Sequence, residues 1–392
     1  MQLDQHPQTS QHRRLIKRRV VHKYPPPRHQ RAKLKLGNLL LLVTGITAFI
    51  WGTTLPFRQQ SRSRPPTIIP HPLAVTSQPS QPQRKSPEFI YNVTTTPPQI
   101  YDQTLQDIVD QTIQLVASKN FPTEPLSITL IDVSDPHAHT FAGYQNQVLR
   151  FPASVAKLFW MVAFYEALDR GMIANPKSFN LDLERMMSIS DNDGASRILD
   201  AITQTESGPA LSGEALTTFL QKRFQINQFF RQAGYENIRL STKNYPIYQR
   251  QEQEPTGRDL QVRENDSFRN QVTTDHAARI FYEIYTRQAV SPQYSAQMAY
   301  LLTRDLNPRR WRNDPISPIK GFLGEPLPPK IYFGSKVGYT SKSRQEVAFI
   351  RTLDDRAMYI VVVFAEDPAY AKDDTIFPTI SEFIFTQMLN RP

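Results

Sequence analysis

The stretch "FPASVAKLFW", residues 151–160, places a serine and a lysine three positions apart, Ser154 and Lys157. The apolar residues around them predict a largely buried helix over about 154–171. Residues three apart are neighbours on one helix face. A lysine in a poorly solvated cleft loses its charge readily, so a neutral Lys157 would accept the proton of Ser154. The pattern S-x-x-K also arises by chance in a chain of 392 residues, so it decides nothing alone.

A second pattern lies in "SISDNDGASRIL", residues 188–199. Ser190, Asp191 and Asn192 follow a polar turn and open a predicted helix over about 191–203. Serine and aspartate are preferred N-caps for purely structural reasons, so this pattern alone indicates a helix start.

A third pattern lies in "YFGSKVGYTSKSRQEVAFI", residues 332–350. Lys336, Val337 and Gly338 end an extended stretch that leads into a predicted hairpin. A lysine on an exposed edge strand commonly serves only to block edge pairing. In a site, the same lysine is a fixed cation for a substrate carboxylate, and Gly338 lets a substrate amide lie against the strand.

The remaining elements indicate an α+β fold. "LSITLIDV" at 126–133 alternates like a strand, and "QEVAFIRTL" and "AMYIVVVFAE" form a hairpin around 354–356. Apolar periodicity predicts helices over 102–120, 154–171, 191–203, 213–234, 274–287, 292–304 and 375–389. We therefore expect an antiparallel sheet built from both ends of the domain, flanked by terminal helices, with an inserted all-helical lobe. The cleft between sheet and lobe is the expected site.

Composition excludes several classes of protein. The chain has no cysteine, which excludes disulfides, zinc–thiolate sites and thiol nucleophiles. The net charge is +10, but residues 1–36 carry ten of the 46 basic side chains and one of the 36 acidic ones. The remainder is nearly neutral, so we expect no nucleic-acid partner.

The N-terminal hundred residues predict a membrane tether. Residues 36–55 carry no charge, a length suited to a transmembrane helix, and no signal-peptide cleavage site follows. We predict a basic cytoplasmic tail at 1–35, an uncleaved signal anchor at 36–56 and, by the positive-inside rule, an extracytoplasmic remainder at the cell (inner) membrane. Residues 57–100 contain nine prolines and no glycine, which predicts an extended linker before a domain at 101–392.

Together, in this order, the three patterns resemble those of the penicillin-recognising serine hydrolases, above all class A β-lactamases, whose motifs are S-x-x-K, S-D-N and K-T-G. The resemblance covers about residues 101–392 and includes "NQVTTDHAARIFYEIY" at 270–285. It implies a β-lactamase/transpeptidase-like fold and, without metal or other cofactor, opening of β-lactam amides through an acyl-serine, with antibiotic resistance as a consequence. We expect a monomeric catalytic domain.

The resemblance also implies residue roles. Ser154 would be acylated by a β-lactam or a D-Ala-D-Ala-like peptide, with Lys157 as general base. Ser190 would relay a proton towards the leaving nitrogen, Asn192 would hold Lys157 and the substrate amide, and Lys336 would attract the carboxylate.

Further roles fall on the third motif and its neighbours. The N–H groups of Ser154 and Tyr339 would form the oxyanion hole, beside Gly338. Arg344 would supply a second carboxylate-binding cation, the alternative being a solvated hairpin charge. Val337 replaces the family's threonine or serine, and Thr340 or Ser341 is the expected substitute for the lost hydroxyl.

Val337 is one departure from the family's motifs, and a second departure concerns deacylation. Class A enzymes carry a glutamate in an E-x-x-L-N loop that activates water, but here Tyr245 stands before Pro246. Glu252, Glu254 and Glu264 are alternatives by proximity only. The chain is therefore expected to be a hydrolase of uncertain turnover; alternatively it is a D,D-peptidase or esterase, a sensor that stays acylated, or an inactive relative.

Overall fold

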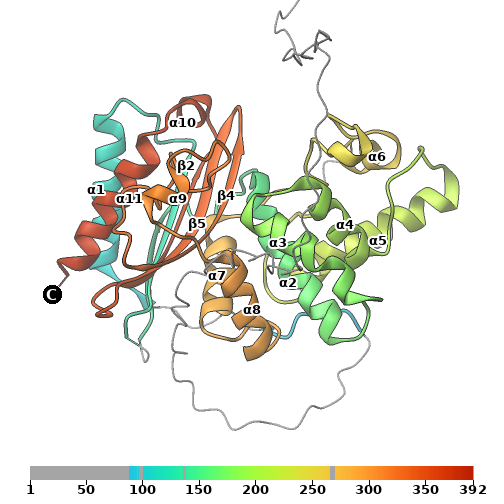
Figure 1. Cartoon of the computed structure of the whole chain (residues 1–392), viewed down its shortest axis with the longest axis horizontal. Coiled ribbons are helices and arrows are strands. Elements are labelled where there is room, and N and C mark those ends of the chain that lie inside the picture. Colours follow the sequence, from blue (N-terminus) through green and yellow to red (C-terminus); the bar gives the residue numbers. More distant parts are fainter. Residues whose placement is uncertain (1–87, 95, 97–99, 136–137, 265–269, 392) are drawn as a thin grey trace, which may run out of the picture. The chain divides into compact units, whose positions relative to one another are not determined.

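The computed structural model describes residues 88–94, 96, 100–135, 138–264 and 270–391 (Figure 1). The predicted tail, signal anchor and most of the linker lie outside these residues. Among the described residues, no helix combines the length and apolarity needed to cross a membrane.

The centre of the domain is a six-stranded sheet in the order β1-β3-β2-β6-β5-β4. Its strands are β1 (Ile100–Tyr101), β2 (Leu126–Asp132), β3 (Thr140–Tyr144), β4 (Tyr332–Thr340), β5 (Ser343–Arg351) and β6 (Met358–Ala365). All neighbours are antiparallel except β1 and β3, which pair in parallel. The prediction of a wholly antiparallel sheet is therefore wrong at this edge, because the short β1, which precedes the first helix, pairs with β3 in parallel.

Helices cover both faces of the sheet. On one face, α1 (Gln103–Ser118) and α11 (Ile376–Leu389) lie side by side, as Figure 1 shows. On the other, α7 (Thr274–Tyr285) packs against β2, β5 and β6. Alternate residues of β6 enter the two cores, with Val362 on the α7 side and Val363 on the α1 side. This explains why the strand reads as a continuous apolar run.

The inserted lobe is helical, as predicted. The helices that were expected from periodicity are α2 (Ala156–Asp169), α4 (Asn192–Thr203), α5 (Gly213–Arg231), α7 and α8 (Pro292–Leu302). Shorter elements were not predicted: α3 (Asn180–Ser188), α6 (Gly257–Glu264), α9 (Pro308–Trp311), α10 (Pro368–Lys372) and the 3₁₀ turns 153–155, 176–179 and 248–250. They lack enough turns to show a clear period.

The folded domain begins before the predicted boundary at residue 101. Tyr91 is fully buried and donates a hydrogen bond to Glu283 Oε2 at 2.6 Å. Asn92 bonds the carbonyl of Gln288 and the amide of Val290. Residues 88–94 therefore belong to the domain, because their aromatic side chains pack although the segment follows a proline-rich run.

Candidate active site

Ser154 lies in the 3₁₀ turn that leads into α2. The turn is tightly shaped, since Ala153 has a φ of 46°, in the left-handed region that non-glycine residues seldom occupy. Asn244 holds this conformation by donating its side-chain amide to the Ala153 carbonyl at 3.2 Å. The backbone N–H groups at this helix start are the kind that can bind an oxyanion.

Lys157 is buried directly beneath Ser154, one helical turn along α2. Its Nζ lies 3.0 Å from Ser154 Oγ and 2.6 Å from Asn192 Oδ1. Burial lowers the pKa of Lys157 to about 7, against a smaller opposing effect of the Asp191 carboxylate. A large fraction of Lys157 is therefore uncharged near neutral pH, as proton abstraction from a hydroxyl requires.

Ser190 lies between two lysines. Its Oγ is 3.2 Å from Lys157 Nζ and 2.9 Å from Lys336 Nζ, and its φ is 59°. The N-cap interpretation also holds, but for the next residue: Asp191 Oδ2 accepts the N–H of Gly194 at 2.7 Å. The turn thus combines a helix cap with a hydroxyl that faces both amines.

Asn192 joins Lys157 to the loop that follows α5. Its Oδ1 accepts from Lys157, and its Nδ2 donates to the Pro246 carbonyl at 3.0 Å. The structure thus gathers all five residues of the three motifs, Ser154, Lys157, Ser190, Asn192 and Lys336, into one hydrogen-bonded group.

β4 is the edge strand of the sheet, and its open edge can be followed residue by residue. The Phe333 carbonyl accepts the Arg304 N–H at 2.9 Å, and the Ser335 carbonyl accepts from the Arg304 side chain at 2.7 Å. The Val337 carbonyl accepts from Lys336 Nζ at 2.9 Å. Because outward-facing groups recur at every second residue, the N–H of Tyr339 also faces out from this edge.

Gly338 brings this edge against the serine turn. A Cβ at this position would lie 2.6 Å from the Pro152 carbonyl oxygen and 3.0 Å from the Ser154 nitrogen. Only glycine allows this approach, which places the Ser154 N–H beside the strand that presents the Tyr339 N–H.

Lys336 is buried at this edge. Burial lowers the pKa of Lys336 well below its ordinary value, and the nearby charges of Lys157 and Arg304 lower it further, with Glu346 opposing them. A bound carboxylate would favour the charged form of Lys336.

Thr340, one of the two expected substitutes for the missing motif hydroxyl, has hydrogen-bond partners within the hairpin, and the role of Ser341 stays a prediction. The Thr340 hydroxyl lies 2.9 Å from Ser343 Oγ across the hairpin and accepts the Lys342 N–H. Thr340 is thereby engaged within the turn. Val337 lines the cleft without a polar group.

Arg344 is buried, so the alternative of a solvated hairpin charge is wrong. Its guanidinium donates to the Tyr370, Gly321 and Ala371 carbonyls and to Asp374 at 2.8 Å. Arg344 lines the cleft beside Tyr339, but most of its N–H groups already have partners; its role as a carboxylate ligand stays a prediction.

In the loop near Asn192, Tyr245 stands before Pro246, where the family's glutamate is missing. The Tyr245 hydroxyl is buried without a hydrogen-bond partner, and burial raises the pKa of Tyr245 far above its usual range. Glu254 and Glu264 are exposed, and Glu254 pairs with Arg263. Glu252 is largely buried and accepts from Arg250 and Thr256.

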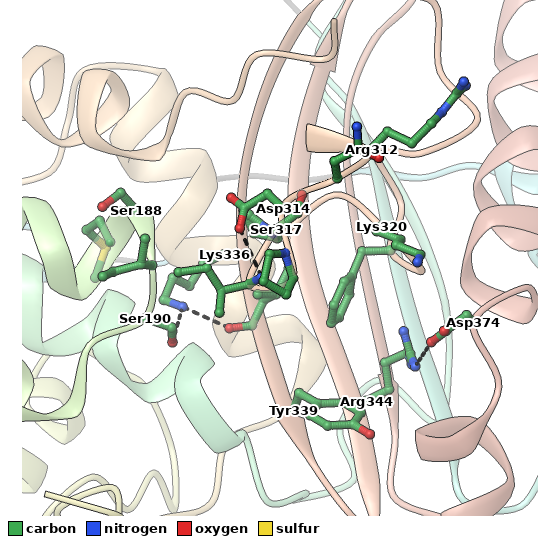
Figure 2. Close-up of a pocket in the computed structure, with 18 residues that line it drawn as sticks. Ser188, Ser190, Arg312, Asp314, Ser317, Lys320, Lys336, Tyr339, Arg344 and Asp374 are labelled. Atoms are coloured by element: carbon green, nitrogen blue, oxygen red, sulfur yellow. Dashed lines mark hydrogen bonds and ion pairs between the residues drawn. The ribbon is translucent and has the colours of Figure 1, made fainter. Parts of the chain in front are cut away.

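A cleft of about 550 Å³ opens beside Ser190 and Lys336. Figure 2 shows Lys336 reaching from β4 towards Ser190, with Tyr339 and Arg344 further along the sheet. The segment between α8 and β4 lines a further side of the cleft with Arg312, Asp314, Ser317 and Lys320, none of which the sequence motifs indicated. Among the described residues, no group of three or more His, Asp or Glu side chains could hold a metal ion.

This fold and the Ser154–Lys157 pair define a β-lactamase-like serine hydrolase. The model of the β-lactamase enzyme family matches residues 108–388, more than half of the chain. The chain therefore belongs to the β-lactamase enzyme family, which confirms the resemblance. No curated protein matches the chain.

Solved structures show the same fold at low identity. A class A β-lactamase from Bacteroides cellulosilyticus DSM 14838 has a TM-score of 0.50 and 15% identity, covering 74% of this chain and 99% of its own. The TLA-3 extended-spectrum β-lactamase has a TM-score of 0.51 and 10% identity, covering 73% of this chain and 100% of its own. At such identities the likeness concerns the fold alone.

Proposed function

We propose that the protein is a membrane-anchored serine hydrolase that opens β-lactam amides through an acyl-serine. The observation that carries this proposal is the 3.0 Å contact between Ser154 Oγ and Lys157 Nζ, with the pKa of Lys157 lowered to about 7. This arrangement supplies a base without histidine or metal.

In the proposed acylation, Ser154 Oγ attacks the lactam carbonyl carbon while Lys157 takes its proton. The N–H groups of Ser154 and Tyr339 stabilise the oxyanion. When the intermediate collapses, the C–N bond breaks and Ser190 passes a proton from the Lys157 ammonium to the leaving nitrogen. The contacts of Ser190 Oγ with the Nζ atoms of Lys157 and Lys336 support this relay. Lys336 binds the substrate carboxylate, and Asn192 holds Lys157 and the substrate amide.

A second function is favoured by the loop that holds Tyr245. Deacylation needs a base for water, and the residue before Pro246 offers a buried phenol with a raised pKa instead of a carboxylate. The acyl-enzyme would then persist. The chain would act as a slow D,D-peptidase or esterase, or as a sensor of β-lactams or peptidoglycan fragments.

Intact mass spectrometry tests both functions. The full chain in detergent is mixed with benzylpenicillin, and a chromogenic cephalosporin measures turnover. Repeated turnover supports the β-lactamase, and a stable adduct of one drug per chain supports the slow acylating protein. No adduct, or an adduct that survives Ser154→Ala, contradicts the proposal.

Glu252 is the acidic side chain to test for deacylation. It is largely buried near the Tyr245 loop, whereas Glu254 is exposed and provides a matched control. If Glu252 activates water, Glu252→Gln lengthens the lifetime of the acyl-enzyme and Glu254→Gln does not. Equal lifetimes in both variants and the wild type would remove Glu252 from the mechanism.

The membrane anchor is a separate part of the proposal. The uncharged run at 36–55 behind a basic tail supports insertion with the N-terminus in the cytoplasm and the catalytic domain outside. Full-length protein should remain in the membrane fraction after a high-salt wash, and protease added to spheroplasts should degrade the domain. Deletion of residues 1–56 should release it; a soluble full-length protein would contradict the anchor.

A further inference from the structure

One guanidinium connects the two walls of the active-site cleft. Arg304, just after α8, uses a single terminal nitrogen, Nη2, to donate to the Met187 carbonyl and to the Ser335 carbonyl, each at 2.7 Å. Met187 lies in the last turn of α3, on the wall formed by the helical lobe. Ser335 lies in β4, on the wall formed by the sheet.

Both carbonyls lack an ordinary partner within their own element. The last four carbonyls of a helix have no N–H to accept, and Met187 is one of these in α3. Ser335 faces the open edge of β4, where no further strand pairs. A buried carbonyl without a donor is costly, so Arg304 fixes both segments rather than merely touching them.

The two carbonyls stand next to reacting groups. Ser335 immediately precedes Lys336, and Met187 comes three residues before Ser190. Ser190 Oγ and Lys336 Nζ are 2.9 Å apart, so the separation of the two walls decides whether this contact forms.

Arg304 itself does not face the substrate. Met187, Ser190 and Lys336 line the cleft, whereas Arg304 does not. Its Nη1 donates to the Leu301 and Thr303 carbonyls, and its Nε is buried without a hydrogen-bond partner. Both terminal nitrogens are thus committed to backbone behind the wall and not to a ligand carboxylate.

We infer that Arg304 is a positioning residue that sets the distance between Ser190 and Lys336, and hence proton delivery to the leaving nitrogen and the hold on the substrate carboxylate. The inference rests on the proposed function. It makes no demand on the Ser154–Lys157 pair, because Ser154 lies in the 3₁₀ turn before α2, Lys157 lies in α2, and the hydrogen bonds of Lys157 go to Ser154, Ser190 and Asn192.

Two acylating agents separate this role from a general structural one. Benzylpenicillin has a carboxylate and an amine leaving group, so it needs Lys336 and Ser190. p-Nitrophenyl acetate has no carboxylate, and its leaving group departs as the stable p-nitrophenolate while the acetyl group stays on Ser154, so the ester needs only Ser154, Lys157 and the oxyanion hole. Acylation of the full chain in detergent is followed by mass for penicillin and by absorbance for the ester.

Arg304→Met, which keeps an unbranched stem but removes the donors, should slow penicillin acylation about 100-fold, the loss expected for misplacement of a catalytic group by roughly 1 Å. Acylation by the ester should change less than threefold. Arg304→Lys should restore much of the penicillin rate, because one ammonium can donate to both carbonyls. Arg309→Met, at an exposed arginine of α9, is the matched control.

The variants also test coupling to Ser190. In a Ser190→Ala background, Arg304→Met should cost clearly less than it does in the wild type, because the proton transfer through Ser190 is already lost and only the hold on the carboxylate is left to be weakened. Equal loss with both agents, or none with penicillin, would overturn the positioning role; so would a fully additive double variant. A wild type that forms no penicillin adduct would instead contradict the proposed function itself.

Discussion

Lys157 and Lys336 contact the same hydroxyl: their ammonium nitrogens lie 3.2 Å and 2.9 Å from Ser190 Oγ. Both side chains are buried, and each pKa is lowered mainly for that reason. Two buried cations around one oxygen repel each other, so the free site favours a state with at least one neutral amine. A substrate carboxylate that binds Lys336 as an ammonium would leave Lys157 as the neutral base.

The first prediction concerns the pH dependence of acylation. Lys157 must be uncharged to accept the Ser154 proton, and the lysine is protonated below its pKa of about 7. The second-order rate of acylation by benzylpenicillin should therefore rise from pH 5 and level off above about pH 7. Intact mass at timed intervals measures it. Lys157→Met should give a low, flat profile; a flat profile in the wild type would show that Lys157 is not the base.

A second prediction concerns a shift of the pH profile of acylation. The Asp191 carboxylate raises the pKa of Lys157, so Asp191→Asn should lower the pKa and shift the acid limb of the acylation profile to lower pH. Asparagine caps helices about as well as aspartate, so the start of α4 should survive. Glu184→Gln on α3, an exposed position, serves as the control. A shift towards higher pH, or none, would contradict the electrostatic coupling.

Much of the fold and of the site could be predicted because the signals are local. Apolar periodicity locates α2, α4 and α11, and the contact between Ser154 and Lys157 follows from helical spacing. The order of three short motifs then indicates that distant segments meet.

What the sequence does not reveal is how backbone groups find partners. The sequence indicates no special role for Arg304 and predicts Arg344 to bind a substrate carboxylate, yet each arginine bonds several carbonyls that are far away in the chain. Nothing in local spacing identifies these carbonyls. The early start of the domain was missed for a related reason, since Tyr91 finds its partner Glu283 only in the folded structure.

A third prediction concerns the close approach of β4 to the serine turn. Gly338→Ala would place a Cβ 2.6 Å from the Pro152 carbonyl oxygen, so backbone must move and the N–H groups of Ser154 and Tyr339 must separate. Since loss of one oxyanion donor costs about 10²–10³ in rate, acylation by both benzylpenicillin and p-nitrophenyl acetate should fall by that factor.

The control for this change is Gly208→Ala, whose Cβ would meet only the end of the flexible Arg258 side chain. It should acylate at the wild-type rate. Thermal unfolding of both variants should be recorded, because a Gly338→Ala protein that is folded but fully reactive would show that the approach of Gly338 to Ser154 does not matter for the oxyanion.

The fourth prediction concerns stability. Glu346 on β5 is fully buried, with Oε2 accepting the Leu323 N–H at 2.6 Å, and burial raises the pKa of its carboxyl to about 8. Between pH 4.5 and 8 the folded chain keeps a proton that the unfolded chain releases, so this group makes the free energy of unfolding fall as pH rises, by about 1.4 kcal/mol per pH unit at most. Glu346→Gln keeps an N–H acceptor and cannot ionise, so the stability of this variant relative to wild type should increase from pH 5 to pH 8 in urea unfolding. The exposed Glu382→Gln should track the wild type.

A difference in stability between Glu346→Gln and wild type that stays constant with pH would mean that Glu346 is ionised throughout. The buried charge beside Lys336 and Arg304 would then have to be counted as an anion in the acylation step.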